Sequence, residues 1–121
     1  MTSERVRKSK VMIAVSHADV APRFDLTLEA VIAAVAEGGV EGEPRVLLIS
    51  EPSGDELCAL AVREGAELVV CGGIDEVHFD YLGWKQIRVI DGVIGPWQQA
   101  LEQLAEGRLE PGAILSGAVS P

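Results

Sequence analysis

The segment ELVVCGGIDEVHFDYLGWKQIRVI, residues 67–90, decides the fold class of this chain. Its first apolar run, residues 67–71, has the length and the β-branched content of a buried strand. Two glycines follow this run, then a helix is predicted over 75–83 and a second strand over 87–90. A strand, a helix and a strand in this order indicate parallel strands whose sheet is covered by helices.

Helices are also predicted on both sides of this segment. Ser53 and Glu56 form a capping box, in which Ser53 caps the first turn and Glu56 reaches back, so a helix is predicted over 54–64. A Gly-Pro pair precedes the last helix, predicted over 96–106, because proline is favoured at a helix start. Its apolar stripe predicts packing against the sheet and consists of Trp97, Leu101 and Leu104.

The first part of the chain predicts strands with one ambiguous segment. Strands are expected over 10–16 and 44–50. The apolar residues of 28–36 fit helical spacing and also alternate as in a strand, so the pattern leaves both structures open. The Gly- and Glu-rich residues 37–43 are expected to form a hairpin loop.

Length and composition indicate a single domain. The chain has 121 residues, of which 48% are hydrophobic, enough to bury one core. The domain is expected to cover 10–109. A flexible basic segment is expected over 1–9, and a loosely held tail rich in Gly, Ser, Ala and Pro over 110–121.

Charge and hydropathy exclude several classes of protein. The net charge is −9, and residues 11–121 hold eighteen acidic and six basic residues. Such a surface repels phosphates, so nucleic-acid binding is not expected. No apolar run approaches the ~20 residues that cross a bilayer, and the N-terminus does not resemble a signal peptide. We therefore expect a cytoplasmic protein with no membrane contact, whose two cysteines are free thiols.

The Cys71-Gly72-Gly73 turn is the first candidate site. It follows a predicted parallel strand, and ligands of open α/β sheets bind beyond the carboxyl ends of such strands. Glycines admit a ligand close to the backbone, and the helix beginning near Asp75 favours an anion. Cys71 adds a soft sulfur ligand. The alternative is a tight turn beside a buried structural cysteine, with Asp75 serving only as a helix cap.

The loop after the first strand is the second candidate site. It contains His17, a candidate metal ligand, and Arg23, a candidate anion-binding group. If the two strands are parallel neighbours, this loop and the Cys-Gly-Gly turn share one rim of the sheet. The alternatives are a solvated histidine and a salt bridge from Arg23 to Asp19 or Asp25.

Four segments together resemble the dinitrogenase iron–molybdenum cofactor biosynthesis family: KVMIAV (10–15), VAPRFD (20–25), LVVCGGI (68–74) and IRVIDGVIGPW (87–97). The likeness extends over roughly residues 10–109. It implies an α/β, ribonuclease-H-like fold with a mixed five-stranded sheet and the element order βββαβαβα. On that basis 28–36 is expected to be a strand.

The resemblance implies non-catalytic binding or carriage of an iron–sulfur or molybdenum–iron–sulfur cluster, or of its precursor. A cluster donor or acceptor protein is the implied partner. The family has Pro-His-Phe-Gly where this chain has Pro-Arg-Phe-Asp, so Arg23 replaces the family's histidine. The metal ligands are therefore expected to be Cys71 and His17, and the other cluster-binding residues to be Arg23, Gly72, Gly73 and Asp75.

Two other functions compete with cluster binding. A magnesium-dependent nuclease on this fold needs carboxylates on the first strand, and residues 11–16 contain none. A ligand-free adaptor needs no such groups, and in it the Cys-Gly-Gly turn is only structural.

Overall fold

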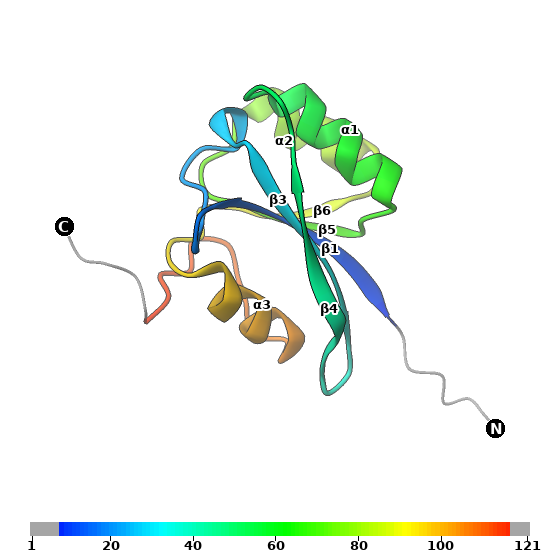
Figure 1. Ribbon diagram of the computed structural model, residues 1–121, viewed down its shortest axis with the longest axis vertical. Coiled ribbons are helices and arrows are strands. Elements are labelled where there is room, and N and C mark those ends of the chain that lie inside the picture. The colour runs from blue at the N-terminus through cyan, green and yellow to red at the C-terminus, as the bar shows by residue number, and fades with distance from the viewer. Residues whose placement is uncertain (1–7, 117–121) are drawn as a thin grey trace.

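The computed structural model describes residues 8–116, in which a mixed β-sheet carries helices on both faces (Figure 1). The strands and helices follow one another along the chain as β1 (Ser9–Ser16), β2 (Asp19–Val20), the 3-10 helix η1 (Phe24–Leu26), β3 (Glu29–Ala36), β4 (Gly39–Leu48), α1 (Gly54–Glu64), β5 (Leu68–Val70), α2 (Glu76–Trp84), β6 (Arg88–Ile90) and α3 (Trp97–Ala105).

The sheet has six strands, with the path β4-β3-β1-β5-β6 and β2 paired to β1. β1 is antiparallel to β3 and parallel to β5, so the antiparallel and parallel halves of the sheet meet at β1. The prediction of five strands is therefore wrong. The extra strand, β2, lies inside the predicted loop, and its two residues are too few to show an alternating pattern.

The ambiguous segment 28–36 is a strand, β3, as the family resemblance implied. Six of its eight residues are buried. The strand is covered on both faces, and a strand of that kind has a continuous apolar run instead of a clean alternation. This burial explains why its residues also fit helical spacing.

Strand β4 begins at Gly39, five residues earlier than predicted. The expected loop over 37–43 shrinks to a turn at Glu37 and Gly38, and Gly39 pairs with Ala36. The polar sequence that suggested a loop is tolerated because β4 is an edge strand whose residues are mostly exposed.

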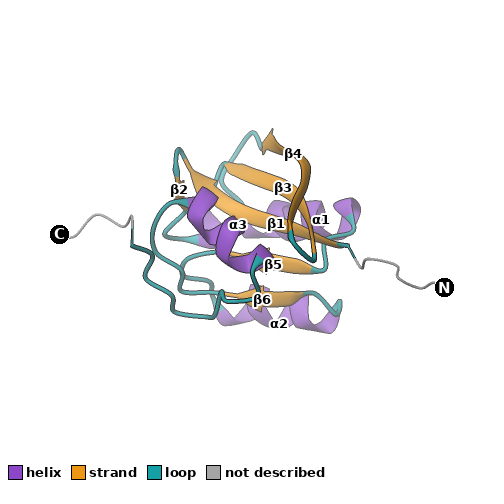
Figure 2. Cartoon of the chain, turned by 90° about the horizontal axis from the view of Figure 1, so that it is seen from below, coloured by secondary structure: helices purple, strands orange, loops and turns teal. Residues whose placement is uncertain are grey.

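Two separate cores lie on the two faces of the sheet. Figure 2 shows α1 and α2 on one side of the strands and α3 on the other. Met12 and Ala14 of β1 pack on the side of α1 and α2, whereas Val11, Ile13 and Val15 pack on the side of α3. This is the period of two that a strand imposes on its side chains.

Helix α3 packs against the sheet as its apolar stripe predicted. Leu101 is buried, and Trp97 and Leu104 are partly buried against the same core. The described part of the tail also contributes, because Leu115 is buried there and donates its N–H to the carbonyl of Ile94 at 2.9 Å. The rest of the predicted tail and most of the basic N-terminal segment lie outside the described residues.

Within residues 8–116, no helix has the length and apolar character needed to span a membrane.

Candidate functional site

A pocket of about 560 Å³ lies beside the end of β1, and we call it the rim pocket. The candidate residues His17 and Arg23 both line it. The other candidate residues, Cys71, Gly72, Gly73 and Asp75, do not line it. The remaining lining is largely apolar and consists of Val15, Ser16, Ala21, Pro22, Leu26, Thr27, Leu28, Glu29, Leu48 and Ile49.

His17 is exposed in the tight turn between β1 and β2, and its backbone has a φ of 57°. Non-glycine residues avoid this left-handed region, and strained backbone of this kind is concentrated at functional sites. The backbone N–H of His17 donates to Oε1 of Glu29 at 3.3 Å. His17 thus lines the rim pocket from a backbone conformation with a cost that a glycine would avoid.

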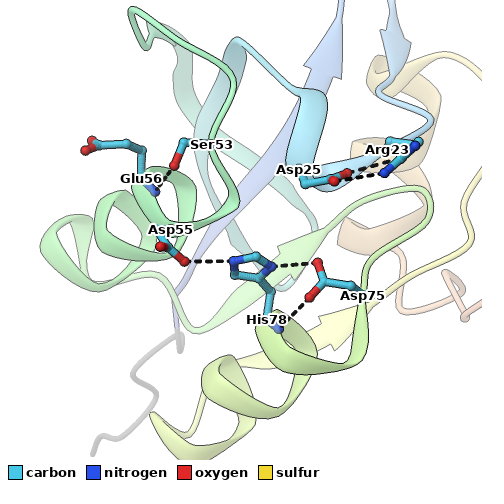
Figure 3. Close-up of polar contacts among 7 residues, drawn as sticks. All are labelled: Arg23, Asp25, Ser53, Asp55, Glu56, Asp75 and His78. Carbon is cyan, nitrogen blue, oxygen red and sulfur yellow. Dashed lines mark hydrogen bonds and ion pairs between the residues drawn. The ribbon is translucent and has the colours of Figure 1, made fainter.

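Arg23 forms a two-pronged ion pair with Asp25 (Figure 3). Its Nη2 lies 2.8 Å from Oδ2 and its Nε lies 3.2 Å from Oδ1 of Asp25. The salt bridge that sequence analysis left open is therefore present. The Arg23 side chain is still 63% exposed, so the guanidinium remains accessible to a ligand in the rim pocket.

The backbone N–H groups of Gly72 and Gly73 are already used, contrary to the expectation that they are free for an anion. Gly72 donates to the carbonyl of Ala21 at 3.1 Å, and Gly73 donates to the carbonyl of Pro22 at 2.8 Å. The N–H of Phe24 returns a bond of 2.8 Å to the carbonyl of Gly73. A Cβ at Gly72 would clash with the carbonyls of Ala21 and Pro22, so the glycine is there to let two backbones meet.

The side chain of Cys71 is fully buried and does not face the rim, which corrects the expectation for this residue. Val69 and Cys71 pack in the core under α1 and α2, and Val70 packs in the opposite core. Alternation along the chain thus turns Cys71 inward. Burial, with a further contribution from Asp91 and Cys58, raises the pKa of Cys71 to about 12, which keeps the thiol protonated.

Within residues 8–116, no three His, Cys, Asp or Glu side chains gather in a way that would hold a metal ion.

Asp75 is the N-cap of α2, the simpler of the two roles considered for it. Its Oδ2 accepts the backbone N–H of His78 at 3.2 Å, and its Oδ1 lies 2.6 Å from Nδ1 of the same histidine. The other ring nitrogen of His78, Nε2, lies 2.9 Å from Oδ1 of Asp55 in the first turn of α1 (Figure 3). Together these three residues form what we call the His78 clasp, which joins the N-terminal ends of the two helices.

The charge state of the His78 clasp follows from its geometry. Both ring nitrogens face a carboxylate, and only a protonated imidazole has two N–H donors. Burial lowers the pKa of His78, but the hydrogen bonds and negative charges of Asp75 and Asp55 outweigh it and raise the pKa above its ordinary 6.5. The hydrogen bond from His78, opposed by partial burial, lowers the pKa of Asp75.

The His78 clasp is not predicted by the sequence alone. An Asp followed three residues later by a His at a helix start signals the contact between Asp75 and His78. The contact with Asp55 spans 23 residues and has no local signal. The glycine at position 54 also belongs to this site, since a Cβ there would lie 2.5 Å from Cε1 of His78.

Comparison with known proteins gives a likeness in fold. No family model matches the chain, and no curated protein matches it. The crystal structure of PH0822 superposes with a TM-score of 0.74 at 20% sequence identity, covering 84% of this chain and 94% of that chain. The crystal structure of a protein named a "putative dinitrogenase", MJ0327 of Methanocaldococcus jannaschii, superposes with a TM-score of 0.69 at 19% identity, covering 92% and 98%. The NMR structure of MJ0327 gives a TM-score of 0.68. The chain therefore has the α/β fold of PH0822 and of MJ0327.

Proposed function

We propose that this protein binds an anionic metal–sulfur cluster, or a precursor of one, in the rim pocket without catalysing a reaction. The observation that carries the proposal is the placement of His17 and Arg23 on one apolar-walled pocket. The fold likeness to a dinitrogenase-named protein is compatible with a role of this kind. The ribonuclease-H-like assignment, the cytoplasmic setting and a donor or acceptor protein for the cluster belong to the same proposal.

The chemistry of the pocket suits a soft anion. Arg23 supplies a positive charge that a cluster can share with Asp25, and its planar fork presents several N–H donors. His17 supplies the imidazole nitrogen, a ligand suited to iron. Apolar side chains make up most of the rest of the lining, and a bound cluster would displace water from them.

Cys71, Gly72, Gly73 and Asp75 have no direct contact with the cluster in this proposal. The thiol is buried, the glycine N–H groups are bonded to the loop that carries Arg23, and Asp75 is bonded to His78. The Cys-Gly-Gly turn stabilises the loop that carries Arg23, because Gly73 forms backbone hydrogen bonds with Pro22 and Phe24.

Anaerobic reconstitution tests the proposal. The full chain is incubated with ferrous iron and sulfide, with and without molybdate, then desalted and assayed for iron, sulfide and molybdenum. Arg23→Gln is expected to retain several-fold less metal than the unaltered protein. Arg108→Gln is the matched control, because Arg108 is also 63% exposed and also pairs with a carboxylate two residues away, that of Glu106.

His17→Gly separates ligation from stability. Glycine relieves the left-handed backbone, so the variant is expected to be as stable as the unaltered protein or more so, while metal retention falls. Cys71→Ala is expected to leave retention unchanged if it folds. The proposal is wrong if the unaltered protein takes up no cluster, or if Arg23→Gln and His17→Gly both retain it fully.

A ligand-free adaptor is the second candidate. The inward-facing Cys71 and the bonded glycines favour it, because they give the Cys-Gly-Gly turn a purely structural role. Failure of cluster uptake in the experiment above, by a protein that remains folded, is the result that selects the adaptor.

A further inference from the structure

Helix α2 exposes more apolar surface than its packing uses. Leu82 is its one buried residue, whereas Val77 is 74% exposed and Trp84 is 77% exposed. Tyr81 and Phe79 are also exposed. Large apolar side chains at such exposure mark interaction surfaces when they are contiguous.

Three of these exposed side chains form a continuous stripe. Val77, Tyr81 and Trp84 follow the spacing i, i+4 and i+7, which places them on one face of the helix. The rings of Tyr81 and Trp84 have centroids 6.5 Å apart. The ammonium of Lys85 lies 5.7 Å from the Tyr81 centroid and 5.3 Å from that of Trp84. These rings therefore already hold a cation.

The stripe borders a groove between α1 and α2 of about 270 Å³, the α1–α2 groove. Val77 and Tyr81 line it from α2, and Cys58 and Ala59 line it from α1. Val62, which is 41% exposed, lies one turn beyond Cys58 and extends the apolar surface on α1. Asp55 and His78 complete the lining, and the His78 clasp holds the two helices at their N-terminal ends.

The charge around the groove is strongly negative. Residues 51–86, which include both helices, contain eight acidic and two basic residues. Glu76 and Asp80 are exposed on α2 beside the stripe, and the Asp55 side chain is 93% exposed at the mouth of the groove. Anionic lipid and nucleic acid are repelled by this surface, whereas a cationic partner is attracted.

We propose that the α1–α2 groove and the Val77–Tyr81–Trp84 stripe are a docking surface for a partner protein that presents a basic, amphipathic helix. The apolar side chains of that helix fill the groove beside Val77 and Tyr81, as in other helix-in-groove complexes. Its lysine or arginine side chains pair with Asp55, Glu76 and Asp80. The surface is separate from the rim pocket, so this proposal holds whether or not the protein binds a cluster.

A synthetic peptide tests the chemistry of this surface. The probe is a fluorescently labelled amphipathic peptide of leucine and lysine, about 18 residues or five helical turns long. Its binding to the full chain is measured by fluorescence anisotropy. Trp84→Ala is expected to weaken binding about tenfold, because tryptophan is among the residues that carry most of the energy of an interface, and Val77→Ala is expected to weaken it to a smaller extent. Ile114→Ala is the matched control, since Ile114 is as exposed as Val77 at 74% and lies outside both helices, and it is expected to bind normally.

Five results would overturn the proposal. The first is the absence of peptide binding, and the second is unchanged affinity in both Trp84→Ala and Val77→Ala. The third is equal binding of a glycine–lysine peptide of the same charge, which would mean that charge alone is recognised. The fourth is binding of the full chain, without peptide, to phosphatidylglycerol vesicles that Trp84→Ala abolishes, which would assign the surface to a membrane. The fifth is a concentration-dependent dimer that Trp84→Ala abolishes, which would assign the surface to a second copy of this chain.

Discussion

The Nδ1 atom of His78 lies 2.6 Å from Oδ1 of Asp75, so the residue that caps α2 also holds an imidazole from the same helical turn. Asp55 approaches the opposite edge of the ring from α1. A histidine between two carboxylates makes the packing of the two helices sensitive to pH.

The His78 clasp is expected to stabilise the protein most at mildly acidic pH. The pKa of His78 is raised, so its contribution is fully present below about pH 6.5 and is lost as the pH rises through the folded-state value. The pKa of Asp75 is lowered from 3.8, so its contribution is present above that pH and is lost as the pH falls through its folded-state value. Urea unfolding should give a lower unfolding free energy at about pH 9 than at about pH 5.5. This difference between the two pH values should be smaller in His78→Gln than in the unaltered protein.

NMR titration of the His78 ring tests whether Asp75 raises the pKa of this histidine. Asp75→Asn is expected to lower the titration midpoint, because the amide accepts hydrogen bonds but carries no charge. Asp80→Asn, on the same helix, is the matched control and is expected to leave the midpoint nearly unchanged. Equal midpoints in Asp75→Asn and the unaltered protein would contradict this account.

Gly72→Ala is expected to destabilise the fold by about 1–3 kcal/mol, the usual cost of overpacking. The added Cβ meets the carbonyls of Ala21 and Pro22, which are backbone atoms and cannot rotate away. Gly83→Ala is the control, since a Cβ there meets nothing within 4 Å and alanine favours the helix. Chemical unfolding of both variants checks the prediction, which fails if the two changes have the same sign.

The two cysteines are expected to resist thiol reagents in the folded protein. The pKa of Cys58 and that of Cys71 are each raised to about 12, mainly by burial. Ellman's reagent at about pH 8 should therefore react with neither thiol until urea unfolds the chain, and then with both. Rapid modification of Cys71 in the native protein would restore it as a candidate cluster ligand.

Leu101→Ala is expected to cost about 2–5 kcal/mol of unfolding free energy, because Leu101 of α3 is 4% exposed and packs in the core between this helix and the sheet. Leu48→Ala, at a position 73% exposed on the edge strand, is expected to change it by less than about 0.5 kcal/mol. A loss below about 0.5 kcal/mol at Leu101 would mean that α3 detaches from the sheet easily.

Periodicity and helix caps predicted the location of every α-helix within residues 8–116 and of β1, β5 and β6. They left β3 open between helix and strand, and only the family resemblance implied a strand there. The capping box gave the start of α1 at the correct residue, because Ser53 accepts the N–H of Glu56 at 3.1 Å. The local sequence pattern did not predict the start of β4, because the position of this strand in the sheet decides its structure. The polar residues 39–43 form a strand only because β4 lies at an edge of the sheet.

The candidate site was less predictable than the fold. His17 and Arg23 line one pocket, since both lie between β1 and β3, but Cys71, Gly72 and Gly73 do not form the second wall that was predicted. Cys71 was misjudged because alternation gives two possible faces, and only the packing of α1 and α2 decides which face a given residue takes. The contact between His78 and Asp55 depends on tertiary structure alone.

The position of β1 at the centre of the sheet sets an order of events during synthesis on the ribosome. One edge of β1 pairs with β3, which follows it closely along the chain. The other edge, at Val11, Met12 and Ile13, pairs with Leu68, Val69 and Val70. A nascent chain that has released only β1 to β4 therefore presents an open, apolar strand edge, the kind of surface that chaperones shield from aggregation, until β5 emerges and completes the pairing.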